Sequence, residues 1–223
     1  MSQSISLYKQ LANHKLFNKT INFDLKRIKS VLKKLGNPEK KLNNVINFLG
    51  SSGKFTTLRS VKCFIEANKK TTTAYISPSL KDIKERFWMG NRFLTYQEIR
   101  KSIKLIAKQK VRLTIFEVLT VIYVIYAAKQ NVDYHLVEAG ALFAKDSTNI
   151  FDFPMAQVIV NINKQHLNFL AKNKKALDEV IYQKVGFLSN FTNIYIDKQK
   201  LYVLNKIKKN LKNNKSKINY PNT

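Results

Sequence analysis

The hydrophobic pattern of the chain predicts short buried strands that alternate with helices. Apolar runs of strand length occur at 45–49, 73–76, 134–138, 157–162 and 194–196. Apolar residues recur at helical spacing over 55–69, 95–110, 114–129, roughly 172–186 and 199–213. Strands and helices that alternate in this way are typical of a parallel sheet with helices on both faces. We therefore predict an α/β fold with a doubly wound, mostly parallel sheet.

The two ends of the chain differ from this central pattern. The spacing predicts a helix over 5–35, because one helical face carries Phe23, Ile28, Val31, Leu32 and Leu35. Gly36 followed by Pro38 ends that helix. At the other end, residues 214–223 are polar and are expected to fray. We divide the chain into a helical segment at 1–44 packed on the core, a domain at 45–213 and a polar tail at 214–223.

Two predicted helices carry an acidic residue near their start. Thr95 and Glu98 have the spacing of a capping box at the start of the helix over 95–110. Glu117 is the one charge near the start of the very apolar helix over 114–129. Its two interpretations are a charge that stabilises the helix N-terminus and a functional carboxylate.

An apolar strand at 45–49 runs into two glycines, a lysine and two threonines, which is typical of a phosphate-binding loop. Glycines let backbone N–H groups face a polyphosphate, Lys54 can reach the outer phosphates, and Thr56 can hold magnesium. The loop opens at Gly50, and Phe55 stands where the consensus has Ser or Thr. The alternative interpretation is an ordinary glycine-containing turn between a strand and a helix.

Two further residues are predicted at the same edge of the sheet. Glu138 ends the strand at 134–138, and His166 follows the strand at 157–162. Open α/β sheets bind ligands outside the carboxyl ends of their strands, so a strand-end carboxylate there is suited to a metal ion beside a nucleotide. His166 has two interpretations, a surface residue and a ligand.

The amino-acid composition excludes few classes of binding partner. The net charge is +26, but the excess is nearly all lysine spread along the chain and mixed with asparagine. No recognition motif for nucleic acid accompanies it, so nucleic acid is not the expected partner. The single cysteine, Cys63, fits a small core residue in a reducing cytoplasm. The N-terminus has no signal-peptide pattern, and the apolar run from Val118 to Ala128 is too short to span a membrane.

Several short sequence blocks occur in the same order and at similar spacing as in one known protein family. They are Leu35-Gly36-Asn37-Pro38, Gly50 to Thr56, Ser77-Pro78-Ser79-Leu80, Glu85-Arg86, Phe116 to Thr120, Val137 to Gly140, Asp146 to Asn149, His166 and Lys184-Val185-Gly186. From Tyr8 to about Gly186 the chain resembles the N-terminal, ATP-binding domain of the folylpolyglutamate synthase and dihydrofolate synthase family, in the Mur ligase superfamily.

The resemblance implies a P-loop-type α/β domain of a cytoplasmic ligase. Such enzymes use ATP and magnesium to phosphorylate a pteroate or folate carboxylate, and glutamate then attacks the acyl phosphate. The implied ATP-binding residues are Gly50, Ser51, Ser52, Gly53, Lys54, Thr56 and Thr57. The implied metal ligands are Thr56, Glu138, His166 and Lys184, the last as a carbamate that bridges a second metal ion. Lys54 and Lys184 have the catalytic roles, and the substrate-binding residues are Ser77, Pro78 and Arg86.

The chain also departs from the family pattern. The loop E-x-G-L-G-G-R-x-D lacks two glycines and the arginine here, where it reads Glu138-Ala139-Gly140-Ala141-Leu142-Phe143-Ala144-Lys145-Asp146. Family members continue into a second domain that completes the adenine and glutamate sites. Two hypotheses follow. The chain is a truncated or divergent ATP-binding domain, with another chain as one source of the missing part, or it is a non-catalytic remnant or binding module that uses its basic surface.

Overall fold

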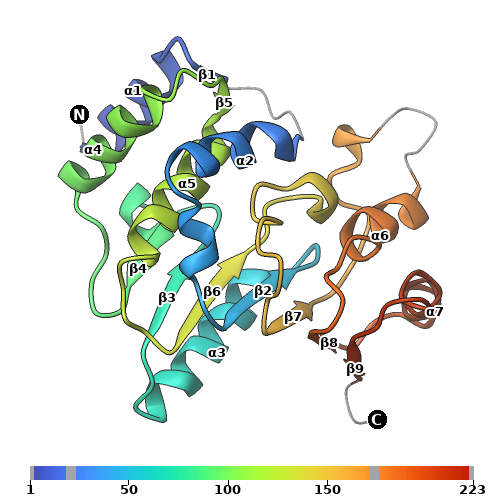
Figure 1. Cartoon of the computed structure of the whole chain (residues 1–223). Coiled ribbons are helices and arrows are strands. Elements are labelled where there is room, and N and C mark those ends of the chain that lie inside the picture. The colour runs from blue at the N-terminus through green and yellow to red at the C-terminus, as the bar shows by residue number, and fades with distance from the viewer. Residues whose placement is uncertain (1–2, 19–23, 171–175, 221–223) are drawn as a thin grey trace.

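The computed structural model describes residues 3–18, 24–170 and 176–220, and its centre is a seven-stranded sheet (Figure 1). The strand order is β4-β3-β6-β2-β7-β8-β9, with β4 antiparallel to β3 and the other pairs parallel. The strands are β2 (Val45–Leu49), β3 (Thr72–Tyr75), β4 (Phe87–Met89), β6 (Tyr134–Glu138), β7 (Ala156–Ile159), β8 (Asn193–Ile196) and β9 (Lys217–Asn219). The predicted α/β fold with a mostly parallel sheet is confirmed.

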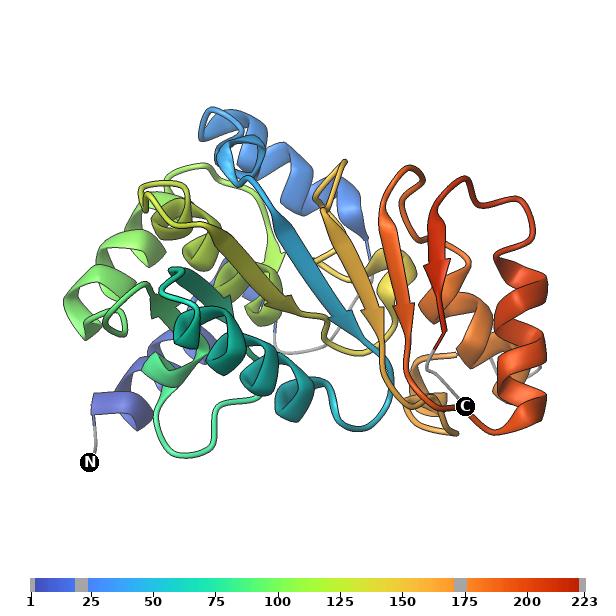
Figure 2. The same cartoon turned by 90° about the horizontal axis from the view of Figure 1, so that it is seen from below.

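Helices cover both faces of this sheet (Figure 2). On one face, Leu58 of α3 (Lys54–Ala67) packs with Phe48 and Leu136. The other face carries α2 (Leu25–Lys34), α4 (Tyr96–Ala107), α5 (Ile115–Ala127), α6 (Leu177–Val185) and α7 (Leu201–Asn210). Successive strand residues point to opposite faces, so a strand between two helical layers is apolar on both sides. This explains why β2 and β6 were recognisable as continuous apolar runs.

The N-terminal segment is not the single helix that the sequence predicts at 5–35. It forms α1 (Gln3–Asn13), β1 (Phe17–Asn18) and α2, and β1 pairs with β5 (Leu113–Thr114). Phe23 lies outside the described residues. The predicted end of the helix is correct, since α2 stops at Lys34 and Gly36 adopts a φ of +83°. Leu7 and Leu11 of α1 are buried in the same core as α4 and α5, so the segment completes that core instead of lying over its edge.

Several smaller predictions are also wrong. The tail is not frayed throughout, because Lys217–Asn219 forms β9 beside β8. The strand predicted to reach residue 162 ends at Ile159. Of the helix predicted at 172–186, the structure shows α6 at Leu177–Val185, and residues 172–175 lie outside the described residues. Cys63 is exposed on α3 and is not a core residue. None of the helices in the described part of the chain is long and apolar enough to cross a membrane.

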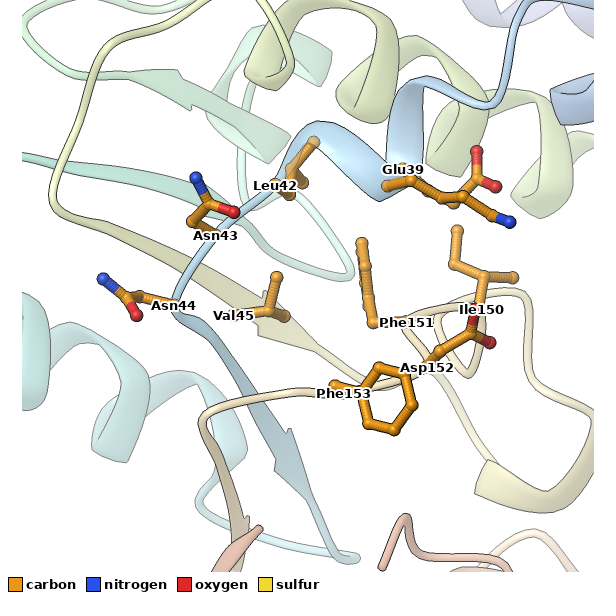
Figure 3. Close-up of a pocket in the computed structure, with 10 residues that line it drawn as sticks. Glu39, Leu42, Asn43, Asn44, Val45, Ile150, Phe151, Asp152 and Phe153 are labelled. Atoms are coloured by element: carbon orange, nitrogen blue, oxygen red, sulfur yellow. The ribbon is translucent and has the colours of Figure 1, made fainter. Parts of the chain in front are cut away.

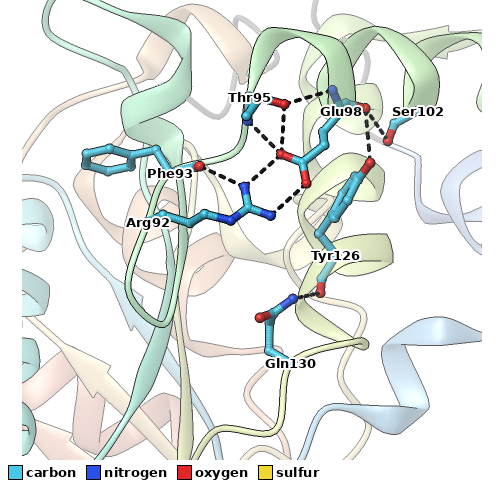
Figure 4. Close-up of polar contacts among 7 residues, drawn as sticks. All are labelled: Arg92, Phe93, Thr95, Glu98, Ser102, Tyr126 and Gln130. Carbon is cyan, nitrogen blue, oxygen red and sulfur yellow. Dashed lines mark hydrogen bonds and ion pairs between the residues drawn. The ribbon is translucent and has the colours of Figure 1, made fainter.

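The predicted capping box at the start of α4 is confirmed (Figure 4). Thr95 accepts a hydrogen bond from the Glu98 backbone N–H, and the Glu98 carboxylate accepts one from the Thr95 N–H at 2.7 Å. The same carboxylate accepts two hydrogen bonds from the Arg92 guanidinium, at 2.7 and 2.8 Å. The side-chain hydrogen bonds from Arg92 lower the pKa of Glu98 to about 2, against the opposing effect of burial.

We expect Glu98→Gln to lower the free energy of unfolding by about 1 kcal/mol at neutral pH, because it removes the negative charge that binds the Arg92 guanidinium and lies at the N-terminus of α4. The carboxylate stabilises the fold above the pKa of an unfolded glutamate, about 4.3. That stabilisation is lost as the pH falls toward the folded-state pKa of about 2. Urea unfolding across this range should show the parent and the variant converge in acid. A difference that persists undiminished at the acid end would contradict this account.

The structure decides between the two interpretations of Glu117 in favour of a helix N-terminal charge. Thr114 and Glu117 form a second capping box at the start of α5. The Glu117 carboxylate also forms an ion pair with the Arg27 guanidinium of α2 and accepts a hydrogen bond from it, both at 3.3 Å. This buried acid therefore joins two helices of the core, and we assign it no chemical role.

Candidate functional site

Three loops meet at one edge of the sheet because β2, β6 and β7 are parallel neighbours. Gly50 follows β2, Glu138 ends β6, and residues 160–166 follow β7. The strand order reverses here, since β3 and β6 lie on one side of β2 while β7 lies on the other. Crevices at such a reversal are where open α/β sheets bind ligands. The topology therefore gathers most of the residues selected from the sequence.

The phosphate loop is fixed by the segment that follows β7. Gly50 has a φ of +142°, and a Cβ built on it would lie 2.5 Å from the Val160 side chain and 2.9 Å from the Val160 carbonyl oxygen. The Ser51 hydroxyl donates to the Asn163 carbonyl oxygen and accepts from the Asn163 N–H, both at 3.1 Å. Ser52 is held by the side-chain amide of Asn163 at 3.2 Å. The loop therefore has a defined shape without a ligand.

The backbone N–H groups that can bind an anion are those of the first turn of α3, and not those of Ser51 and Ser52. The N–H groups of Ser51 and Ser52 both donate to the Asn161 carbonyl oxygen, at 2.8 and 3.3 Å. The first hydrogen bond of α3 runs from the Thr57 N–H to the Gly53 carbonyl oxygen. The N–H groups between them, on residues 54–56, have no partner within the helix, as at any helix N-terminus. Those groups and the helix dipole favour an anion.

Lys54 and Glu138 form the charged centre of the edge. The Lys54 ammonium lies 3.9 Å from one Glu138 oxygen, and the other oxygen accepts a hydrogen bond from the Ser77 N–H at 2.9 Å. Burial raises the pKa of Glu138, and Asp146 also raises it. The Ser77 hydrogen bond and the charges of Lys54 and Arg86 act in the opposite direction. Lys54 is therefore held over the strand end by a carboxylate of opposite charge.

A cavity of about 400 Å³ opens above this pair. Of the predicted site residues, its walls include Ser51, Lys54, Ser77, Pro78 and His166. Burial, followed by the charges of Lys184 and Lys54, lowers the pKa of His166 to about 4. The imidazole is therefore neutral at physiological pH, which is the form that coordinates a metal ion.

Thr56 and Phe55 lie elsewhere. Both line another hollow on the outer side of α3, together with Arg59 and Cys63. Phe55 also packs on the core between α3 and the sheet, so its ring does not crowd the phosphate loop. The structure thus leaves Thr56 a backbone N–H at the loop while its exposed side chain points to a different surface. The residue that donates a hydrogen bond to Glu138 is Ser77, through its backbone N–H.

Arg86 is buried behind the cavity. Its Nε donates to the Tyr8 hydroxyl of α1 at 3.2 Å, and its Nη1 is buried with no hydrogen-bond partner among the described residues. The Tyr8 hydroxyl in turn lies 3.1 Å from the Ser79 hydroxyl. The N-terminal segment therefore reaches the loop that follows β3, where the sequence predicts substrate contacts.

Lys184 is fully buried on α6. Its Nζ donates to the Gly50 carbonyl oxygen at 2.7 Å and to the Ala141 carbonyl oxygen at 2.6 Å. Burial and the charge of Lys54 lower the pKa of Lys184 to about 7, while Asp146 raises it. Lys184 thus joins the phosphate loop to the loop that follows β6.

Some cavity residues were not among the predicted site residues. The further wall residues are Phe116, Gly140, Ala141, Asp146, Gln165 and Phe169. A Cβ on Gly140 would lie 2.7 Å from an Asp146 carboxylate oxygen and 2.8 Å from the Phe116 ring, so only glycine fits between them. Phe116 and Asp146 belong to the matched sequence blocks. That membership was a signal for them, although their residue types alone suggest no particular chemistry.

The residues present fit one magnesium ion better than two. Within the described ranges, no group of three or more His, Cys, Asp or Glu residues is arranged to hold a metal ion. The available set is the Glu138 carboxylate and the neutral His166. Magnesium commonly binds through one or two carboxylates, substrate phosphates and water, so this set suits an ion that arrives with a nucleotide. Lys184 in its unmodified form offers a metal ion no ligand, because its Nζ donates to the Gly50 and Ala141 carbonyl oxygens.

A second hollow of about 550 Å³ lies at the opposite end of the strands (Figure 3). Its walls include Val45 at the start of β2, Phe151, Phe153, Asp152 and Glu39. Burial is the main cause that raises the pKa of Glu39. None of the predicted site residues is among the walls described for this hollow. We therefore place the functional site at the carboxyl end of the strands.

Fold and site together define a class, a parallel α/β domain with a phosphate-loop motif at the reversal of its sheet. No protein-family model matches the chain. The chain is 25% identical over 173 residues to a dihydrofolate synthase/folylpolyglutamate synthase of Bacillus subtilis, which covers 74% of this chain and 39% of that protein. It is 29% identical over 165 residues to the protein of the same name from Mycobacterium tuberculosis, covering 67% and 34% respectively.

Solved structures of similarly named proteins have the same fold as the chain. The Escherichia coli FolC structure, in complex with DHPP and ADP, aligns with a TM-score of 0.84 and 23% identity over 98% of this chain and 51% of that one. The Mycobacterium tuberculosis folylpolyglutamate synthase complexed with ADP aligns with a TM-score of 0.82 and 20% identity. That alignment covers 98% of this chain and 50% of the other. The expected resemblance is confirmed: the chain is similar in sequence and in fold to folylpolyglutamate synthases and dihydrofolate synthases. It spans less than half the length of the curated relatives and about half of the solved chains.

Proposed function

We propose that the chain binds magnesium-ATP at the loop from Gly50 to Thr56, as the nucleotide half of a folylpolyglutamate or dihydrofolate synthase. The observation that carries the proposal is the placement of Lys54, 3.9 Å from Glu138, at the wall of a cavity shared with His166. Phosphoryl transfer depends mainly on positioning and charge neutralisation, and this edge offers a lysine, a metal-binding carboxylate and free helix N–H groups. Two relatives were solved with ADP, one of them with DHPP as well.

The residues of this chain have the following roles in the proposal. The N–H groups of residues 54–56 and the Lys54 ammonium would hold the phosphates, while Glu138 and His166 would hold magnesium. When bound, magnesium neutralises charge on the phosphates. Ser77 and Pro78 line the side of the cavity where a pteroate or folate carboxylate would lie. Arg86 supports that wall through Tyr8 and does not contact the substrate directly in this proposal.

The transfer to glutamate is proposed for the assembled enzyme, with the region that the relatives carry outside the matched part. That region comes either from a longer form of this chain or from a separate chain. We propose the cytoplasm as the compartment, where the exposed thiol of Cys63 would remain reduced.

The test is calorimetric titration of the purified chain with ATP in the presence of magnesium and in the presence of a chelator. We expect saturable binding that magnesium strengthens, and we expect Glu138→Gln to remove most of the magnesium effect because it removes the charged ligand. Absence of saturable binding and of a thermal shift would overturn the proposal. Binding of single-stranded nucleic acid that weakens steeply with salt would instead favour the basic binding module.

A further inference from the structure

We propose that a hollow between α3 and β4 binds a small aromatic carboxylate, at a site apart from the proposed nucleotide site. The hollow has a volume of about 430 Å³, within the range of about 300–1,000 Å³ that small-molecule sites occupy. It lies on the face of the sheet that carries α3, next to β3. We call it the Trp88 hollow, and the walls that bear on the ligand are Phe55, Arg59, Lys62, Leu80, Trp88 and Phe93.

The Trp88 hollow is distinct from the cavity at the phosphate loop. None of the described residues that line one of them also lines the other. Ser77 and Pro78 line the cavity, whereas Leu80 and Glu85, further along the same loop, line the hollow. A ligand in the hollow therefore does not take the place of the phosphates, and its binding does not rest on the proposed function.

The walls of the Trp88 hollow are mainly aromatic and aliphatic. The Trp88 and Phe93 rings meet edge to face with their centroids 5.3 Å apart, and Phe55 adds a third ring from the first turn of α3. Leu80 is 79% exposed and Phe93 is 45% exposed, although both line a concavity. Apolar side chains gathered in an open concavity are typical of a binding site, because burying them against a ligand is favourable. The aromatic ring of the ligand fits this part of the hollow.

The charge of the ligand follows from Arg59. This exposed side chain of α3 lines the hollow and forms no hydrogen bond or ion pair within residues 3–18, 24–170 and 176–220. Its neighbour Lys62 is already engaged, since it pairs with Glu66 at 2.6 Å and lies 4.1 Å from the centroid of the Trp88 ring. A guanidinium can donate two parallel hydrogen bonds to a carboxylate. The hollow therefore combines an apolar wall with a cation that has no partner in the described ranges.

The acidic residue in the wall serves the loop that it belongs to. One Glu85 carboxylate oxygen accepts hydrogen bonds from the N–H groups of Leu80 and Lys81, at 2.7 and 3.1 Å. These bonds fix the loop that carries the exposed Leu80 side chain. One wall of the hollow is thus held in place before a ligand arrives, and a preorganised wall lowers the cost of binding.

The chain carries its own reporters for a direct test. Trp88 is the single tryptophan and Cys63 the single cysteine of the sequence, and both line the hollow. We expect 4-nitrobenzoate to quench the fluorescence of Trp88 saturably and to slow the alkylation of Cys63 by iodoacetamide. The neutral 4-nitrobenzamide should bind about tenfold more weakly, because it keeps the ring and lacks the charge. Quenching that does not saturate, or equal affinities for the two compounds, would overturn the proposal.

The role of Arg59 is tested by Arg59→Gln, with Lys104→Gln as the matched control. Lys104 is exposed on α4, on the other face of the sheet, so both variants remove one surface charge and leave the core unchanged. We expect Arg59→Gln to bind 4-nitrobenzoate about tenfold more weakly, Arg59→Lys to regain most of the affinity, and the control to equal the parent. Unchanged affinity in Arg59→Gln, or an equal loss in Lys104→Gln, would overturn the assignment.

Competition with nucleotide separates this proposal from the proposed function. Magnesium-ADP should leave the affinity for 4-nitrobenzoate unchanged, because the two sites share no described wall residue. Displacement of 4-nitrobenzoate by magnesium-ADP would show that the hollow is not a separate site and would overturn the proposal. A chain that fails to bind nucleotide can still bind 4-nitrobenzoate, so the failure of one proposal is distinguishable from the failure of the other.

Discussion

Replacing Lys54 by alanine is expected to weaken magnesium-ADP binding roughly 10- to 100-fold while the chain remains folded. A hydrogen bond to a charged group contributes about 1.5–3 kcal/mol, and 1.4 kcal/mol corresponds to a tenfold change in affinity. Lys54 faces the cavity and Glu138, not the apolar core, so its removal leaves the packing of α3 intact. Titration calorimetry measures the affinity, and thermal unfolding followed by circular dichroism checks the fold.

The matched control is Lys62→Ala on the same helix. Lys62 pairs with Glu66 at 2.6 Å and lies over the Trp88 ring, so its loss removes one positive charge from α3 without altering the cavity. The affinity of Lys62→Ala should remain within about twofold of that of the parent, since Lys62 is paired with Glu66 and does not line the cavity. Equal affinities for Lys54→Ala and the parent would remove the phosphate loop from the proposal. Equal losses in both variants would indicate general electrostatic attraction instead.

Gly50→Ala is expected to destabilise the fold by about 3 kcal/mol or more, through combined backbone strain and overpacking. The φ of +142° is unfavourable for any residue with a side chain, and the new methyl group would be 2.5 Å from the Val160 side chain. The Val160 and Asn161 carbonyl oxygens, at 2.9 and 3.1 Å, leave it no alternative space. Relief requires the end of β2 to separate from the segment after β7, which also distorts the phosphate loop.

Gly36→Ala is the control for the backbone term alone. Gly36 has a φ of +83°, but a Cβ there has no neighbour within 4 Å. We expect it to cost about 1 kcal/mol, the ordinary penalty for a left-handed conformation. Urea unfolding of both variants separates the two contributions. Similar losses in the two variants would show that the close approach of Gly50 to Val160 does not limit the fold.

Whether an element could be predicted from the sequence depends on whether neighbouring or distant residues determine it. β2, β6 and the capping box of α4 were predicted, because continuous apolar runs and Thr-x-x-Glu spacing are local patterns. β1 and β9 were missed because such short strands exist only through their partners β5 and β8. The division of the chain into a segment at 1–44 and a domain at 45–213 remains a proposal.

The sequence by itself determined the phosphate-loop motif, the strand-end Glu138 and the resemblance to a family of ligases. Only the tertiary structure decided which of these side chains meet. Glu138 accepts a hydrogen bond from the Ser77 backbone N–H, and the Thr56 side chain lies on another surface, because the direction of a side chain at the start of α3 depends on how that helix docks on the sheet. The bonds from Lys184 to Gly50 and Ala141 likewise join residues far apart along the chain, and no local pattern encodes such contacts.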